Sequence, residues 1–318
     1  MEYSFAPMEG ITTRIYRVLH REMFPGTVKY YAPFIAPDVS GRYKDSQLRD
    51  ILPENNPGIR LIPQLMANNA NAFYIASQSF RELGYAEVNL NAGCPSGTVA
   101  AKHKGSGMLA DLRSLDNFLA DVFSLCDMDI SVKTRMGMES VDEFAAILEV
   151  YNKYPIKQLI IHARDRKGMY KSTPDMEAFA HAASLSRAPV TYNGNIFCAD
   201  DVHRLLSLAP DTKRIMLGRG AVTNPALIRQ LNGGAPASND ELRAFHDRYL
   251  DKLLDSGYGE HNSMARLKEL WYYMIYMYPG SERLYKALNR SRTIADYRAA
   301  ANAIFASGLF DENAVFGG

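Results

Sequence analysis

The chain has 318 residues, enough for one large domain and a smaller one. Its 36 basic and 35 acidic residues leave a net charge of +1, which excludes a general attraction to nucleic acid or anionic membranes, so a polyanion has to meet a local basic patch. Three scattered cysteines, Cys94, Cys126 and Cys198, are too few for a disulfide framework or a zinc site, and no stretch approaches the roughly 18 apolar residues of a membrane span.

These features predict a soluble, unprocessed protein of the cytoplasm with no membrane contact and no obligate protein partner. Short apolar runs rich in β-branched residues then alternate with helical patterns along the first 230 or so positions. The predicted strands are Tyr3–Pro7, Val28–Ala32, Arg60–Leu65, Ala86–Leu90, Ile130–Thr134, Gln158–His162, Val190–Tyr192 and Arg214–Leu217. The predicted helices between them are Asn71–Leu83, Ser114–Phe123, Val141–Tyr151 and Asp200–Leu208, with a short or displaced helix within Pro37–Gly58.

This alternation predicts an α/β fold of the (β/α)8 TIM-barrel type. An open doubly wound sheet is the rival architecture, but it would stop near six strands and carry an early glycine fingerprint, which this sequence lacks. The segment Asn232–Asn239 is rich in glycine, alanine and proline, and only helical patterns follow it. We therefore expect a catalytic barrel over residues 1–235 and a small all-helical domain over residues 236–318, with helix starts near Ser281 and Asp296.

In such a barrel the active site lies where the strands end, so the polar residues at these positions and the turn residues beside them are candidates. They are Pro7, Met8, Glu9, Gln64, Asn89, Asn91, Cys94, Lys133, Arg135, His162, Arg164, Asn193, Gly194, Asn195, Gly218 and Arg219. The last five form glycine-rich turns after the seventh and eighth strands, where backbone N–H groups can approach a phosphate. The alternative is that these glycines only make tight turns.

Lys133 places a cation at a strand end, where it can stabilise an anionic ring such as that of a reduced flavin. The alternative is an ion pair with a barrel carboxylate such as Glu87. His162 is either a hydrogen-bonded core residue or a part of the same site. Cys94 lies between Gly93 and Pro95, which fix the backbone, so its thiol is either a general acid or an inert buried group.

Several stretches resemble the tRNA-dihydrouridine synthases, a family of flavin-dependent enzymes. They are "APMEGITTRIYR", "NLNAGCPSGTV" followed by "GSGML", "SVKTRMG", "IHARDRKGMY", "NGNI" and "MLGRGAVTNP". The resemblance covers nearly the whole chain and implies an FMN-binding barrel followed by a helical domain that grips tRNA. It further implies reduction of the C5=C6 bond of specific uridines to 5,6-dihydrouridine, with NADPH or NADH as the reductant.

The resemblance also implies roles for individual residues. Cys94 is similar to the family's proton donor, and Asn91 to a residue that faces the target uracil. Flavin-ring contacts are implied for Pro7, Met8, Glu9, Gln64, Lys133 and His162, and ribityl or phosphate contacts for Asn193, Gly194, Asn195, Gly218 and Arg219. Asn195 stands where the family usually has an acidic residue, so a backbone contact is the one that the resemblance implies there.

Basic residues gather in three places that could meet RNA. At the barrel mouth we expect substrate contacts from Arg135, Arg164, Lys102 and Lys104, and the loops there also contain Arg166, Lys167 and Lys171. We expect further contacts from a helical run that contains Arg266, Lys268, Arg283, Lys286, Arg290, Arg292 and Arg298. For the helical run, the alternative is a solvated face. Two other functions stay open: a flavin barrel that acts on a free pyrimidine or dihydropyrimidine, and a non-catalytic RNA-binding barrel.

Overall fold

The computed structural model describes residues 1–317 and contains a nearly closed parallel barrel. Its strands are β1 (Glu2–Phe5), β2 (Lys29–Tyr31), β3 (Leu61–Ile62), β4 (Gln64–Leu65), β5 (Glu87–Ala92), β6 (Asp129–Arg135), β7 (Gln158–His162), β8 (Val190–Asn193) and β9 (Arg214–Leu217). The sheet order runs β3-β2-β1-β9-β8-β7-β6-β5-β4, and only Pro63 separates its two end strands. The predicted eight-stranded barrel is therefore confirmed, with its third strand split in two because proline has no N–H to donate.

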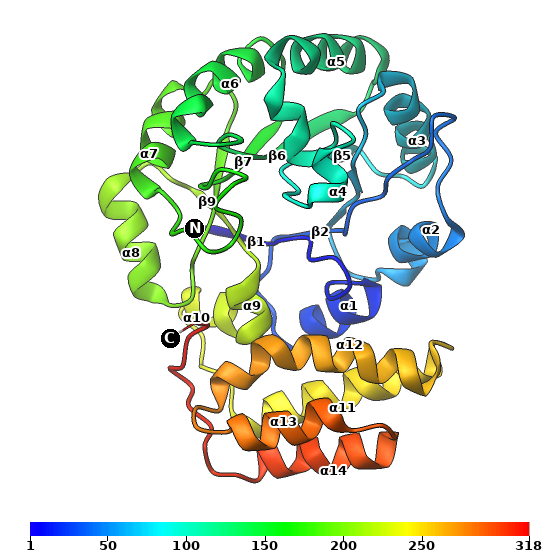
Figure 1. Cartoon of the computed structure of the whole chain (residues 1–318), viewed down its shortest axis with the longest axis vertical. Helices are drawn as coiled ribbons and strands as arrows, with labels where there is room; N and C mark the ends of the chain where they lie inside the picture. The colour runs from blue at the N-terminus through cyan, green and yellow to red at the C-terminus, as the bar shows by residue number, and fades with distance from the viewer. Residues whose placement is uncertain (318) are drawn as a thin grey trace.

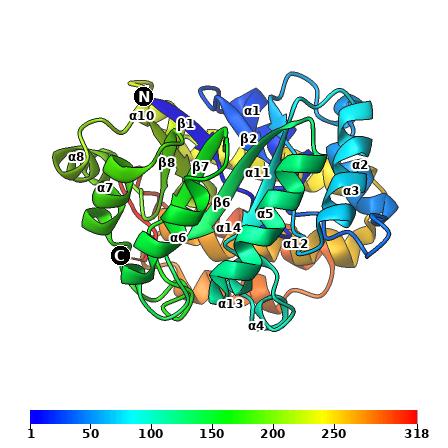
Figure 2. The same cartoon turned by 90° about the horizontal axis from the view of Figure 1, so that it is seen from above.

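Helices surround the barrel and follow the strands in turn (Figure 1). They are α1 (Arg14–Met23), α2 (Asp45–Ile51), α3 (Ala70–Glu82), α4 (Gly97–Ala100), α5 (Leu112–Leu125), α6 (Phe144–Tyr151), α7 (Met176–Leu185), α8 (Ala199–Leu208), α9 (Arg219–Thr223) and α10 (Leu227–Leu231). In Figure 2, α6 and α5 lie on either side of β6. Within the described residues, no helix combines the length and the apolar composition that a bilayer crossing needs.

Four further helices form a separate layer below the barrel in Figure 1. They are α11 (Asn239–Asp255), α12 (Gly259–Met274), α13 (Glu282–Arg290) and α14 (Ile294–Phe305). Ser238 starts α11 with a capping box, because its hydroxyl accepts from the Glu241 N–H (3.1 Å) while the Glu241 carboxylate accepts from the Ser238 N–H (3.0 Å). Helix α13 begins directly after Ser281, as the sequence predicts. The predicted helical region is thus present.

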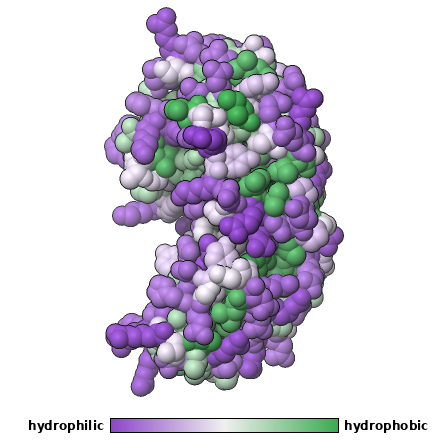
Figure 3. Space-filling view, turned by 90° about the vertical axis from the view of Figure 1, so that its right-hand side faces the viewer, coloured by the Kyte–Doolittle hydropathy of each residue, from purple (hydrophilic) through white to green (hydrophobic). Residues whose placement is uncertain are grey.

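Two of the contacts that join this helical region to the barrel involve α1 and the loop before it. On the first, the Tyr16 ring of α1 packs edge-on against Phe245 and Tyr249 of α11, with ring centroids 5.5 and 5.8 Å apart. On the second, Arg266 of α12 donates to the carbonyl oxygen of Gly10, which follows β1, at 2.5 Å. Figure 3 shows the outline of the molecule hollowed between the barrel and the helical region.

Gly10 has a φ of +79°, a backbone conformation that favours glycine. A Cβ atom at Gly10 would also stand only 2.9 Å from a carboxylate oxygen of Glu269 on α12. A larger residue at position 10 would therefore have a strained backbone and would displace the end of the Glu269 side chain.

Candidate active site

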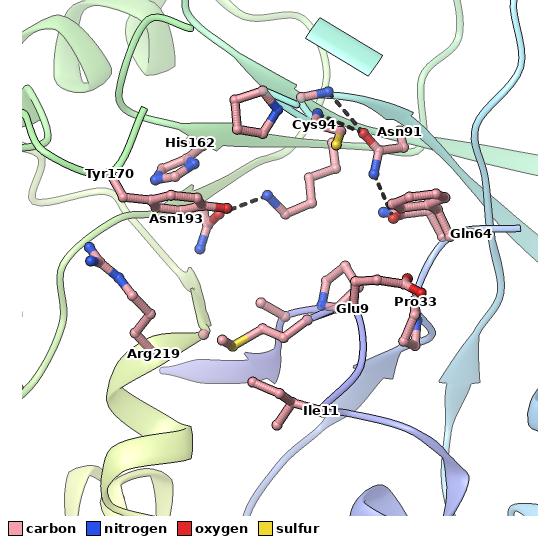
Figure 4. Close-up of a pocket in the computed structure, with 18 of the residues that line it drawn as sticks. Glu9, Ile11, Pro33, Gln64, Asn91, Cys94, His162, Tyr170, Asn193 and Arg219 are labelled. Atoms are coloured by element: carbon pink, nitrogen blue, oxygen red, sulfur yellow. Dashed lines mark hydrogen bonds between the residues drawn. The ribbon is translucent and has the colours of Figure 1, made fainter. Parts of the chain in front are cut away.

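A cavity of about 400 Å³ lies at the carboxyl ends of the barrel strands, and helix α12 contributes to its wall. Parallel strands end at the same rim, so loops that are distant in the sequence meet there. Figure 4 shows side chains from several of these loops pointing into the cavity. Of the residues predicted from the sequence, the lining includes Pro7, Met8, Glu9, Gln64, Asn91, Cys94, Lys133, His162, Arg164, Asn193, Gly194, Gly218 and Arg219.

Cys94 lies just beyond β5, half-buried, and its backbone is held on both sides. The Asn91 side-chain oxygen accepts from the N–H groups of Gly93 (3.1 Å) and Cys94 (2.9 Å). The Cys94 carbonyl oxygen accepts from the Ser106 hydroxyl at 2.8 Å. A Cβ at Gly105, whose φ is +56°, would stand 2.9 Å from the Cys94 Cβ, so the glycine-rich loop packs directly against this cysteine. These contacts fix the backbone from which the thiol projects.

A chain of amide side chains runs from the barrel interior to Cys94. Asn91 donates to Gln64 (2.8 Å), Gln64 donates to Asn89 (2.7 Å), and Asn89 donates to the Ser131 hydroxyl (2.9 Å). Each bond fixes which end of its amide is the oxygen and which the nitrogen. The oxygen of Asn91 is thereby kept turned toward the Cys94 backbone.

Lys133 of β6 donates to the side-chain oxygen of Asn193 on β8 at 2.9 Å. Desolvation, with a smaller repulsion from Arg135, lowers the pKa of Lys133 to about 7. The alternative partner, Glu87, is wrong, because Glu87 pairs instead with Lys29 at 3.3 Å. Lys133 is therefore a hydrogen-bond donor in the cavity, and no carboxylate in the described part of the chain pairs with it.

Two arginines share one amide oxygen at the opposite end of the cavity. Arg164 and Arg219 donate to the Asn195 side-chain oxygen at 3.0 and 2.7 Å, and Arg164 also donates to Nε2 of His162 at 2.9 Å. Burial, reinforced by the neighbouring positive charges, lowers the pKa of His162 well below its usual range, so its ring is neutral at neutral pH. Burial, followed by repulsion from Arg219, lowers the pKa of Arg164 to about 10.

Neither arginine has a carboxylate partner among residues 1–317. Two nearby guanidinium groups without a counter-charge repel each other, and an anion placed between them relieves that repulsion. This end of the cavity therefore favours a phosphate or another anion. Asn195 itself does not line the cavity but aligns the two arginines from behind.

Of the residues predicted at the strand ends and in the loop after Cys94, five lie outside the cavity wall: Asn89, Asn195, Arg135, Lys102 and Lys104. Arg135 is buried and donates to the carbonyl oxygens of Gly93 (3.0 Å), Asp165 (2.7 Å) and Met169 (2.9 Å). It supports the loops around the cavity, and its role in substrate binding stays a prediction. Lys102 is exposed and Lys104 half-buried, both in the loop after Cys94.

Several cavity residues were not predicted as site residues from the sequence. They are Ala6, Ile11, Pro33, Phe34, Gly93, Pro95, Tyr170, Glu269, Tyr272, Tyr273 and Phe316. The Tyr170 ring lies beside two guanidinium groups, 5.2 Å from that of Arg135 and 5.3 Å from that of Arg219. The position of Tyr170 in the basic loop after β7 is a sequence signal that could have marked it as a site residue. No local sequence pattern marks Phe316.

Comparison with known proteins identifies the relatives of this chain. The family model described as dihydrouridine synthase matches residues 4–297. A tRNA-dihydrouridine synthase B of Pseudomonas syringae pv. tomato is 25% identical over 228 residues, which cover 71% of this chain and 66% of that protein. A tRNA-dihydrouridine synthase B of Shewanella oneidensis is 26% identical over 283 residues and covers 84% of each chain. The solved structure of morphinone reductase shares the fold, with a TM-score of 0.53 at 12% identity over 75% of this chain and 87% of its own.

Proposed function

This chain belongs to the dihydrouridine synthase family, and from that premise we propose that it is an FMN-dependent tRNA-dihydrouridine synthase. In this proposal, NADPH or NADH is the reductant, and the product is 5,6-dihydrouridine at specific positions of tRNA. One observation carries it: a single cavity brings the Cys94 thiol together with Lys133, Arg164 and Arg219, none of which has a carboxylate partner in the described residues.

The cavity residues fit a flavin nucleotide. The volume of the cavity, about 400 Å³, lies within the usual range for cofactor sites. Arg164 and Arg219 offer positive charge to a phosphate, and Gly194 and Gly218 expose backbone beside them. The phosphate and ribityl chain would be held by Asn193, Gly194, Asn195, Gly218 and Arg219, and the ring by Pro7, Met8, Glu9, Gln64, Lys133 and His162. When bound and reduced, FMN supplies the hydride for C6 of the uracil.

Cys94 completes the reduction as the general acid. Addition of a hydride at C6 leaves excess electron density at C5, and the thiol proton of Cys94 is transferred there. The two bonds from Asn91 to the backbone at Gly93 and Cys94 hold the sulfur at the cavity wall. Lys133 remains a hydrogen-bond donor in either protonation state and stabilises negative charge on the pyrimidine side of a reduced ring.

The target base has to leave its stack to enter such a cavity, and RNA contact elsewhere is by shape and phosphate. The predicted basic helical run divides into two groups in the structure. Arg266, Lys268 and Arg298 have protein partners, whereas Arg283, Lys286, Arg290 and Arg292 are exposed and have no ion pair among residues 1–317. We propose that the second group, on and just after α13, contacts tRNA phosphates, with residues 236–318 acting as the tRNA-gripping domain.

The test compares Cys94→Ala with Cys198→Ala, a matched control. Cys198 is also half-buried, but it lies at the start of α8 and outside the cavity wall. Purified protein is loaded with FMN, and NADPH oxidation and dihydrouridine formation in a tRNA transcript are measured separately. Cys94→Ala should keep flavin absorbance and NADPH oxidation but lose about 10²- to 10⁴-fold in product formation.

Three outcomes would contradict the proposal. Full product formation by Cys94→Ala would remove the proton-donor role. Wild-type protein that takes up no flavin would favour a non-catalytic RNA-binding barrel. Reduction of free uracil or uridine without reduction of tRNA would favour the small-pyrimidine alternative.

A further inference from the structure

The segment after α14, residues 306–317, returns to the barrel and is here called the tail. In Figure 1 it runs in red from α14 toward α10. The Asp311 N–H donates to the carbonyl oxygen of Met277 at 2.9 Å, which ties the tail to the end of α12 and the short helical turn after it. Near the end of the tail, Phe316 is half-buried and lines the cavity.

Phe316 lies in an aromatic cluster at one end of the cavity. Its ring centroid is 4.6 Å from that of Tyr276, 5.5 Å from that of Tyr273 and 5.8 Å from that of Phe197. These partners come from α12, from the turn after it and from the loop that follows β8. The tail thus closes the gap between the helical region and the barrel at this end.

The group that this cluster encloses is the guanidinium of Arg219. Its central carbon lies 5.1 Å from the Phe316 ring, 5.3 Å from the Tyr170 ring and 5.9 Å from the Phe197 ring. Its one side-chain hydrogen bond is to the Asn195 oxygen, and no carboxylate in the described residues pairs with it. Aromatic faces hold a cation in place without neutralising it.

Such an enclosure changes how strongly Arg219 attracts an anion. Rings that exclude water lower the local dielectric, and the Coulomb attraction between a guanidinium and a phosphate rises accordingly. The rings also restrict the arginine side chain, so less of its conformational freedom is lost when a ligand binds. Both effects strengthen binding of an anionic group and leave a neutral ligand unaffected.

We propose that Phe316 is a positioning residue of the cofactor site, which holds Arg219 toward the phosphate monoester of FMN and shields that contact from water. The inference rests on the proposed function, because it takes FMN as the ligand of the cavity. It assigns the tail to the cofactor site, although the tail follows the helical region in the sequence.

The test uses the difference between FMN and riboflavin, which lacks the phosphate. Flavin-free full-length protein is titrated with each ligand, and quenching of flavin fluorescence gives the two dissociation constants. Phe316→Ala should weaken FMN binding about tenfold and riboflavin binding less than twofold. Phe310→Ala is the matched control: Phe310 is also an aromatic residue of the tail, but it packs on Tyr278 and does not line the cavity, so both constants should stay unchanged.

A double-mutant cycle with Arg219→Gln tests whether Phe316 acts through Arg219. In the Arg219→Gln background, Phe316→Ala should cause no further loss of FMN affinity. An equal loss for FMN and riboflavin, or a full additional loss in the Arg219→Gln background, would overturn the inference while the proposed function stands. So would an unchanged pair of constants combined with a raised KM for tRNA, which would assign Phe316 to RNA contact. A wild-type protein that binds neither flavin would instead refute the proposed function.

Discussion

Replacing Lys133 with methionine should change how the stability of the flavin-free protein depends on pH. In the unfolded chain this lysine holds its proton up to its ordinary pKa of 10.5, but desolvation in the folded protein lowers the pKa to about 7. Between these two values the unfolded state binds more protons than the folded state, so the lysine makes the folded protein more stable as pH rises. At 1.36 kcal/mol per pH unit, the gain from pH 6 to pH 9 is at most about 3 kcal/mol.

Lys133 is only half-buried against the cavity, so solvent screens part of this effect, and we expect a gain of about 1–3 kcal/mol. Urea unfolding of wild type and Lys133→Met at pH 6 and pH 9 measures it. Methionine has a similar volume and does not titrate, and its loss of the bond to Asn193 is the same at both pH values. The free energy of unfolding of wild type relative to the variant should therefore rise with pH. A difference that does not change between pH 6 and pH 9 would show that Lys133 keeps an ordinary pKa and would refute the desolvation argument.

Three further predictions concern the site, the core and the RNA surface. Asn91→Leu removes the acceptor for the Cys94 N–H, so dihydrouridine formation should fall at least about tenfold while NADPH oxidation stays near wild type, as separate stopped-flow and product assays would report. Arg17→Met should lower the free energy of unfolding by about 3 kcal/mol in urea, since Arg17 is fully buried and its loss leaves Asp50 without the partner at 2.9 Å. Lys286→Ala should weaken tRNA binding and lower the slope of log affinity against log salt by about one, and an unchanged slope would exclude Lys286 from the RNA contact.

The barrel could be predicted because each of its strands is a short apolar run with its own local signature. The site followed from it, since the parallel topology brings residues such as Cys94, Lys133 and Arg219 to one rim whatever their separation in the sequence. Partner choice could not be predicted in the same way. Glu87 and Lys133 lie on neighbouring strands, but Glu87 stands opposite Asp129 and Lys133 opposite Asn91, so the two lie at opposite ends of this strand pair. Glu87 pairs with Lys29 instead.

Residues that reach the cavity from outside the barrel were also beyond prediction. Glu269 and Phe316 belong to the helical region and the tail, and their positions depend on how those parts pack against the barrel. No periodicity or spacing in the sequence encodes that packing. For Asn195, the position after β8 was predicted from the sequence. That its side-chain oxygen accepts from two arginines could be seen only in the three-dimensional structure.

The close approach at Gly10 has a consequence for protein engineering. Exchanging the helical region with that of a relative would produce a hybrid only if the incoming helix tolerates the loop after β1 as a neighbour. An alanine at position 10 would have a strained backbone, because φ is +79° there, and it would displace the carboxylate of Glu269, which lines the cavity beside Tyr272 and Tyr273. A change at this contact therefore reaches the wall of the cavity, so the loop after β1 and the helical region have to be exchanged as a matched pair.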